Sequence, residues 1–360
     1  MEPSIEPSRP AARTATVERG SSPGAGSGRV HRLARSTVVL VLMSAWLTGT
    51  AAASTALLSV DTPGWVAGWG GGLVGVVHTA VVAQRVGART SLWIALAVAA
   101  AVGAQLSDRP WVLAGVSVLT AVISGLAAVL LTRPAVTVLG TVVEYVLALS
   151  VAAAGAAAVA GLNATIDTRR YTLLVVGLSI ALAITLVWRL GVGLHGLGGR
   201  GLALSVGAAL LVMGLLVYSQ LLREYGSASV VEGVDQAVAW LSDNLRAVPR
   251  PVEALIGLPA LVWGIGTRSR RPQGWWLCAF GVLGTSMLAA TLATKELDPE
   301  VTALSALYSI SVGLLLGLLA RGVDLALDRR RGETGSGRRV LRTGEVSVLR
   351  PEPSRTRPLR

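Results

Sequence analysis

The sequence is short of the residues that build most active sites. It contains one cysteine, Cys278, and three histidines, His31, His78 and His195. A single cysteine excludes a disulfide within the chain and a metal site made of several cysteines. The histidines lie in a tail, an apolar run and a loop, without the spacing of metal ligands. No Ser–His–Asp or Cys–His arrangement is recognisable, so we expect no metal, no cofactor and no catalytic residues, and hence no enzyme.

Charge is also scarce. Only 14% of the 360 residues are charged, whereas 52% are hydrophobic. The apolar residues come in blocks of about 17–25, the length that crosses a hydrocarbon core of about 30 Å. The net charge of +12 lies at the edges of these blocks and in the tails, so it indicates membrane topology rather than binding of nucleic acid. The expected fold class is all-α, a polytopic integral membrane helix bundle.

The blocks divide the chain into a bundle and two tails. They predict ten transmembrane helices, at about residues 37–59, 64–83, 91–107, 111–132, 136–161, 172–190, 201–222, 252–267, 274–294 and 300–322. The expected domains are a disordered basic tail over 1–35, the bundle over 36–322 and a second disordered basic tail over 323–360. Residues Ala51–Ala53 resemble a signal-peptide cleavage site, but the apolar run continues beyond them, which favours an uncleaved span.

The basic residues predict the orientation of these spans. With the N-terminus in the cytoplasm, all but seven of the 32 Lys and Arg residues face inwards, as the positive-inside rule requires. Both termini are therefore expected to be cytoplasmic. Arginines of the inner loops and of the tail, such as Arg329–Arg331, either contact anionic lipid headgroups or serve only as a charged flank. Lys295 is the only lysine, and this bias suggests a GC-rich bacterial genome and a bacterial cytoplasmic membrane.

One outer segment, 223–250, is long enough to form structure of its own. Val234, Val238, Leu241 and Leu245 recur at helical spacing, which predicts an amphipathic helix on the outer surface that ends before Pro249. Such a helix is either a lid or partner-docking element, or a connector that rests its apolar face on the bundle.

Glu144 is the one acid placed well inside an apolar run, which makes it a candidate functional residue. It shares a stripe of small or weakly polar residues with Thr137, Thr141 and Ala148. Such stripes allow membrane helices to approach closely. At 1.5 Å per residue, Glu144 should lie about 12 Å from the inner end of its span.

His78 should lie at a similar depth, about 9 Å from the inner end of the second span. It shares a helix face with Gly68, Gly71 and Gly75. Our hypothesis is that His78 and Glu144 meet, or line one cavity, and exchange protons, with Thr137 and Thr141 as polar neighbours. The alternative is a protonated Glu144 that is hydrogen-bonded to a threonine or a backbone carbonyl, with His78 a separately satisfied polar residue.

Two functions remain open at this point. The buried acid, and the glycines and prolines that interrupt the second and eighth spans, favour a permease for a small solute, with Glu144 as the candidate for coupling to protons. The scarcity of polar residues inside the spans favours a membrane scaffold, assembly partner or sensor that transports nothing.

Overall fold

The computed structural model describes residues 25–58, 60–107, 109–164, 167–189, 228–271, 274–291 and 298–335 continuously. It also describes residues 207, 210, 214, 352–353, 355 and 357–359. Throughout this part of the chain the regular structure is helical, which agrees with the expected all-α class. The chain divides into two compact units, Met1–Met43 and Ser44–Arg360, and the contacts described below lie within the second.

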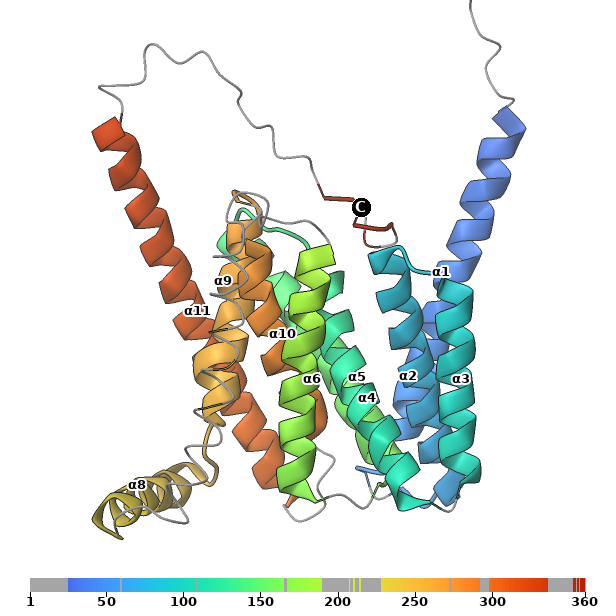
Figure 1. Cartoon of the computed structure of the whole chain (residues 1–360), viewed down its shortest axis with the longest axis horizontal. Coiled ribbons are helices and arrows are strands. Elements are labelled where there is room, and N and C mark those ends of the chain that lie inside the picture. The colour runs from blue at the N-terminus through green and yellow to red at the C-terminus, as the bar shows by residue number, and fades with distance from the viewer. Residues whose placement is uncertain are drawn as a thin grey trace, which may run out of the picture. The chain divides into compact units, whose positions relative to one another are not determined.

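The helices follow the apolar runs closely (Figure 1). They are α1 Ala25–Ser54, α2 Gly64–Val86, α3 Thr90–Leu106, α4 Pro110–Leu131, α5 Val138–Leu162, α6 Thr168–Arg189, α8 Ala228–Leu245, the π-helix η1 Val252–Gly257, α9 Leu258–Arg268, α10 Gly274–Ala290 and α11 Pro299–Gly335. Local signals place several ends: Thr137 accepts a hydrogen bond from the Gly140 N–H at the start of α5, and Gly87 ends α2 with a φ of 69°.

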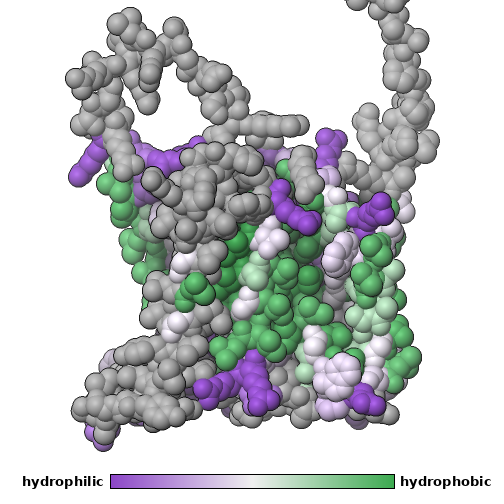
Figure 2. Space-filling view, in the orientation of Figure 1, coloured by the Kyte–Doolittle hydropathy of each residue, from purple (hydrophilic) through white to green (hydrophobic). Residues whose placement is uncertain are grey.

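Six described helices are long and apolar enough to cross a membrane, by length and composition. They include α2, α4, α5 and parts of α1, α6 and α11, while α3 and α10 are shorter apolar helices. Figure 2 shows the corresponding band of hydrophobic residues between more polar ends. The chain is thus compatible with a multi-pass membrane protein. The number of ten spans and the positions of the termini stay predictions, and most of the predicted seventh span, 201–222, lies outside the described residues.

Two helix boundaries, and the continuity of two predicted spans, differ from those expected. Helix α1 begins at Ala25, within the predicted tail 1–35, and α11 continues to Gly335, past the predicted end of the last span at residue 322. The predicted eighth span is formed by η1 and α9 in succession, whereas α2, expected to be interrupted, runs unbroken. The helix expected within 223–250 is present as α8, with Trp240 65% exposed.

The core of the second unit lies where α4, α5, α9 and α10 pack together. Helices α2 and α3 pack against each other and against α4, with α2 also contacting α5. Helix α6 packs on α10, and α11 packs on α9 and η1. On α5, Thr141 and Ala148 are fully buried whereas Val146 is 53% exposed, so this part of the predicted stripe faces other helices, while Thr137 at its start is exposed.

Glycines bring several of these helices into backbone contact. A Cβ built on Gly284 of α10 would lie 2.8 Å from the Cα of Gly257, at the junction of η1 and α9. A Cβ built on Gly125 of α4 would lie 2.6 Å from the backbone nitrogen of Ser286 on α10. Because backbone atoms cannot move aside as a flexible side chain can, these positions require glycine.

Replacing Gly284 by valine should therefore destabilise the bundle, because the new side chain overlaps the backbone of Gly257. Overpacking a core typically costs about 1–3 kcal/mol, and contact with backbone belongs at the upper end. We expect the thermal unfolding midpoint of the detergent-solubilised protein to fall by several degrees. Gly115→Val is the matched control, because the Cβ built on Gly115 of α4 has no neighbour within 4 Å. Equal midpoints for the two variants would contradict this account of the packing.

The predicted orientation can be tested by cysteine labelling. In a Cys278→Ala background, Ala88→Cys lies in the exposed turn between α2 and α3, and Thr168→Cys lies at the exposed start of α6. We expect a membrane-impermeant maleimide added to intact cells to label Cys at 168 and to spare Cys at 88 until the membrane is permeabilised. The reverse pattern would overturn the orientation derived from the arginines.

Candidate functional site

Glu144 lies in the second turn of α5, with its carboxylate directed to the end of the bundle. One carboxylate oxygen accepts a hydrogen bond from the backbone N–H of Arg133, at 2.9 Å, in the loop between α4 and α5. The other forms an ion pair with the guanidinium of Arg355, near the C-terminus. Its side chain is 13% exposed. Glu144 is therefore a paired acid at one end of the bundle rather than an isolated acid deep in it.

The two predicted threonine neighbours belong to the same turns of α5. Thr137 caps the helix, and the Thr141 hydroxyl donates to the Thr137 carbonyl at 3.0 Å. Both hydroxyls therefore serve the backbone of α5 itself.

His78 lies in the middle of α2, 1% exposed, and both of its ring nitrogens are engaged. Its Nε2 accepts a hydrogen bond from the Trp46 indole N–H of α1 at 2.9 Å. Its Nδ1 lies 2.8 Å from the Ser124 hydroxyl of α4. A neutral imidazole with its hydrogen on Nδ1 satisfies both contacts. His78 thus connects three helices through hydrogen bonds.

The structure brings α2 and α5 together, but it gives their ionisable residues different partners. The helices meet where Gly71 approaches the carbonyl of Ala158 and where Gly161 approaches Ala67. Among the described hydrogen bonds and ion pairs, those of Glu144 go to Arg133 and Arg355 and those of His78 to Trp46 and Ser124. The hypothesis of a direct pair therefore has no contact to support it, and a functional role for either residue stays a prediction.

Sequence reasoning did not single out Glu253, which is the more deeply buried acid. It is 0% exposed and lies in η1, where the eighth predicted span departs from regular α-helix. One carboxylate oxygen lies 3.4 Å from the guanidinium of Arg250, and the other has no hydrogen-bond partner. The sequence held a signal for this residue: Glu253 follows Arg250 by three positions and lies between Pro251 and Pro259. Prolines disturb regular helix, and irregular membrane helices often mark functional sites.

The groups around Glu253 are polar and are contributed by other helices. Arg250 donates its backbone N–H to the Ser309 hydroxyl of α11 at 2.8 Å. Tyr145 of α5 lies close enough to interact electrostatically with Glu253, and its hydroxyl donates to the Ile310 carbonyl at 3.0 Å. A carboxylate with a free oxygen in such a place can take up a proton or a small cation, and releasing either would leave a buried charge whose described counter-ion is Arg250 alone.

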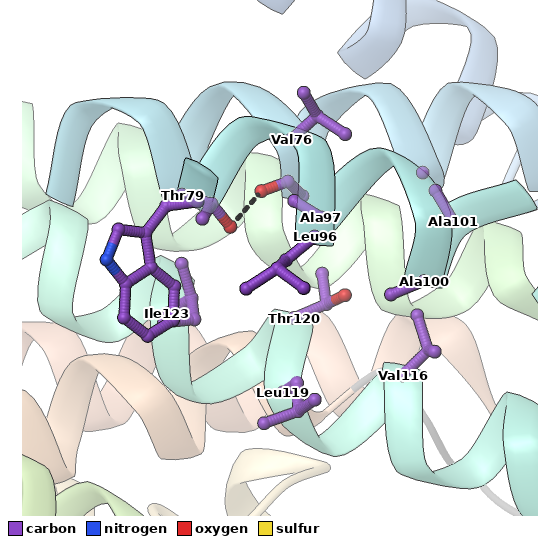
Figure 3. Close-up of a pocket in the computed structure, with 13 residues that line it drawn as sticks. Val76, Thr79, Leu96, Ala97, Ala100, Ala101, Val116, Leu119, Thr120 and Ile123 are labelled. Carbon is purple, nitrogen blue, oxygen red and sulfur yellow. Dashed lines mark hydrogen bonds between the residues drawn. The ribbon is translucent and has the colours of Figure 1, made fainter. Parts of the chain in front are cut away.

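A separate pocket of about 170 Å³ lies between α2, α3 and α4 (Figure 3). Its wall is mostly aliphatic, with Trp93 at one side and the hydroxyls of Thr79 and Thr120 as its polar groups. The Thr79 hydroxyl is already bonded to the Gly75 carbonyl at 2.7 Å. This pocket suits an apolar group, such as an acyl chain, better than a polar solute.

No protein-family model, curated protein or solved structure matches the chain. Within the described residues, no group of three or more His, Cys, Asp or Glu side chains is placed to hold a metal ion.

The separate partners of His78 and Glu144 lead to a measurable expectation. In a double-mutant cycle on unfolding free energy, His78→Gln and Glu144→Gln should be additive to within about 0.5 kcal/mol, because they share no partner. His78→Gln and Ser124→Ala should instead show a coupling of about 0.5–3 kcal/mol, because they share a buried hydrogen bond. A coupling between His78 and Glu144 as large as that between His78 and Ser124 would restore the proposed pair.

Proposed function

We propose that the protein is a permease that moves a small solute across the membrane and couples this movement to protons. The observation that carries the proposal is Glu253, an acid with no exposed surface near the start of the π-helix η1. Ionisable residues inside membrane bundles are costly and most often serve transport of ions or protons. From the composition and the arginine distribution of the sequence, we place the protein in the cytoplasmic membrane of a bacterium.

The local structure around Glu253 supports movement as well as binding. A π-turn leaves backbone carbonyls without regular partners, and interrupted membrane helices place such groups at binding sites in many transporters. The junction between η1 and α9 meets α10 at the backbone of Gly284, and on α11 the side chains of Leu258 and Pro259 pack on Gly313. Glu253 is thus a better candidate for a proton carrier than Glu144, whose carboxylate is already engaged by Arg355.

A second function, a scaffold without transport, is favoured by the same tight packing. The contacts of Gly125 with Ser286 and of Gly257 with Gly284 join α4, α9 and α10 through backbone atoms. Interfaces of this kind stabilise fixed helix assemblies in membranes. On this alternative, Glu253 and Arg250 would be a structural ion pair.

Reconstitution separates the two functions. The protein is reconstituted into proteoliposomes that contain a pH-sensitive dye. Small solutes are then added one at a time, with and without a pH gradient, and the internal pH is followed. We expect at least one solute to produce proton movement. Glu253→Gln should reduce that rate by about 100-fold, in the range lost when a positioned proton-transfer group is removed. Glu144→Gln should have a smaller effect.

Glu300→Gln is the matched control, because the ion pair that the described residues give Glu300 is an exposed one with Arg246. It should leave the rate unchanged. If the wild-type protein moves none of the solutes under either condition, or if Glu253→Gln is as active as wild type, the proton-coupled permease is refuted and the scaffold is favoured.

A further inference from the structure

Buried arginines gather at the end of the bundle where α2 and α9 finish. Arg85, in the last turn of α2, is 1% exposed, and Arg268, the last residue of α9, is 4% exposed. A guanidinium group stays charged in proteins, so burying it is unfavourable unless anions or hydrogen-bond acceptors compensate. The compensation at Arg268 is incomplete.

Arg268 uses only part of its hydrogen-bonding capacity. Its Nη2 donates to the Thr132 hydroxyl at 3.0 Å, and its guanidinium lies 4.3 Å from the centre of the Trp275 ring. Its Nε and Nη1 are buried and have no hydrogen-bond acceptor. The acid paired with it is Glu352, whose Oε1 lies 3.9 Å from Nε, which is too long for a hydrogen bond.

Glu352 is also incompletely bonded. Its Oε2 is buried without a hydrogen-bond donor, although it faces a group rich in donors. In an ideal buried ion pair, the guanidinium nitrogens would donate hydrogen bonds to both carboxylate oxygens at about 2.7–2.9 Å. The carboxylate of Glu352 therefore lies beside the Arg268 guanidinium, where an anion would bind, but it does not form the close hydrogen bonds that a better-fitting anion would form.

The charge around this pair is positive. Arg85 interacts electrostatically with Glu352, Arg268, Arg133 and Arg355, so four guanidinium groups share one region. Among the described ion pairs, Glu352 pairs with Arg268 and Glu144 pairs with Arg355. Arginine favours phosphate because its planar donors match several phosphate oxygens at once.

The segment that carries Glu352 is attached to the bundle by contacts of its own. Arg355 donates from Nε to the Leu131 carbonyl at 2.9 Å and pairs with Glu144. Arg85 donates to the Arg357 carbonyl at 2.9 Å, and the Leu359 N–H donates to the Arg85 carbonyl at 2.9 Å. This C-terminal piece lies beside the end of α2 in Figure 1. These contacts hold Glu352 over Arg268 without requiring a close bond between the two side chains.

We propose that Arg268 and Arg85 form a binding site for a phosphate-bearing anion, and that Glu352 of the chain's own C-terminal segment competes for this site. The ligand is either a soluble phosphate compound or the phosphate headgroup of an anionic lipid, because the same chemistry recognises both. Binding displaces the Glu352 carboxylate and fills the unused donors of Arg268. The site does not depend on whether the bundle transports a solute.

The test uses the full-length protein with two probes. Inorganic phosphate is titrated by calorimetry into protein in an uncharged detergent. Phosphatidylglycerol is compared with phosphatidylcholine in nanodiscs through the thermal unfolding midpoint. Removing the internal competitor by Glu352→Gln should tighten binding of the active probe by about tenfold, within the 5–150-fold range typical of coupled binding. Arg268→Gln should abolish binding in both the wild-type and the Glu352→Gln backgrounds.

The matched control is again Glu300→Gln, which removes a paired acid elsewhere and should leave affinity unchanged. A response to inorganic phosphate supports a soluble ligand, and a response to phosphatidylglycerol alone supports a lipid headgroup. No response to either probe, or equal affinity in wild type and Glu352→Gln, overturns the proposal. Should Arg268→Gln fail to fold, Arg268→Lys keeps the charge, and the comparison of wild type with Glu352→Gln still decides.

Discussion

Backbone contact between helices is the interaction on which this structure depends. In a bilayer, packing one apolar helix on another gains little from the hydrophobic effect, because lipid tails are as apolar as leucine. Van der Waals contact must supply the attraction, and it is largest where small residues allow backbones to approach. The Gly257–Gly284 and Gly125–Ser286 contacts join α4, α9 and α10 in this way. Helices α2, α3, α5, α6 and α11 pack around that centre.

Tight packing leaves little room for polar groups, so each buried polar group needs a partner or indicates a role. His78 is fully satisfied by Trp46 and Ser124, which suits a group that fixes three helices together. Glu253 and Arg268 are buried as deeply, but each keeps polar atoms without a partner. Burying polar atoms without hydrogen-bond partners is unfavourable, so Glu253 and Arg268, unlike His78, need a functional explanation for their burial.

Much of the fold was predictable from local signals. An aspartate followed by proline is a local signal for a helix start, and Asp298 accepts the N–H of Glu300 where α11 begins at Pro299. The small stripe on α5 predicted which face is buried, since Thr141 and Ala148 face inwards and Val146 outwards. The candidate site was predicted less well. Glu144 was expected to pair with His78, but the side chain that pairs with it, Arg355, lies 211 residues away in a segment expected to be a disordered tail.

The sequence by itself determined where the helices lie and which faces they bury. Hydrocarbon imposes a fixed length and a low polarity on each span, and both are local properties of a chain. Only the tertiary structure decided which polar groups meet. Arg355 is one of many arginines, and no local pattern distinguishes the one that reaches Glu144. Glu253 lies within the predicted span 252–267, next to Pro251, and its complete burial depends on α10 and α11, which pack on η1.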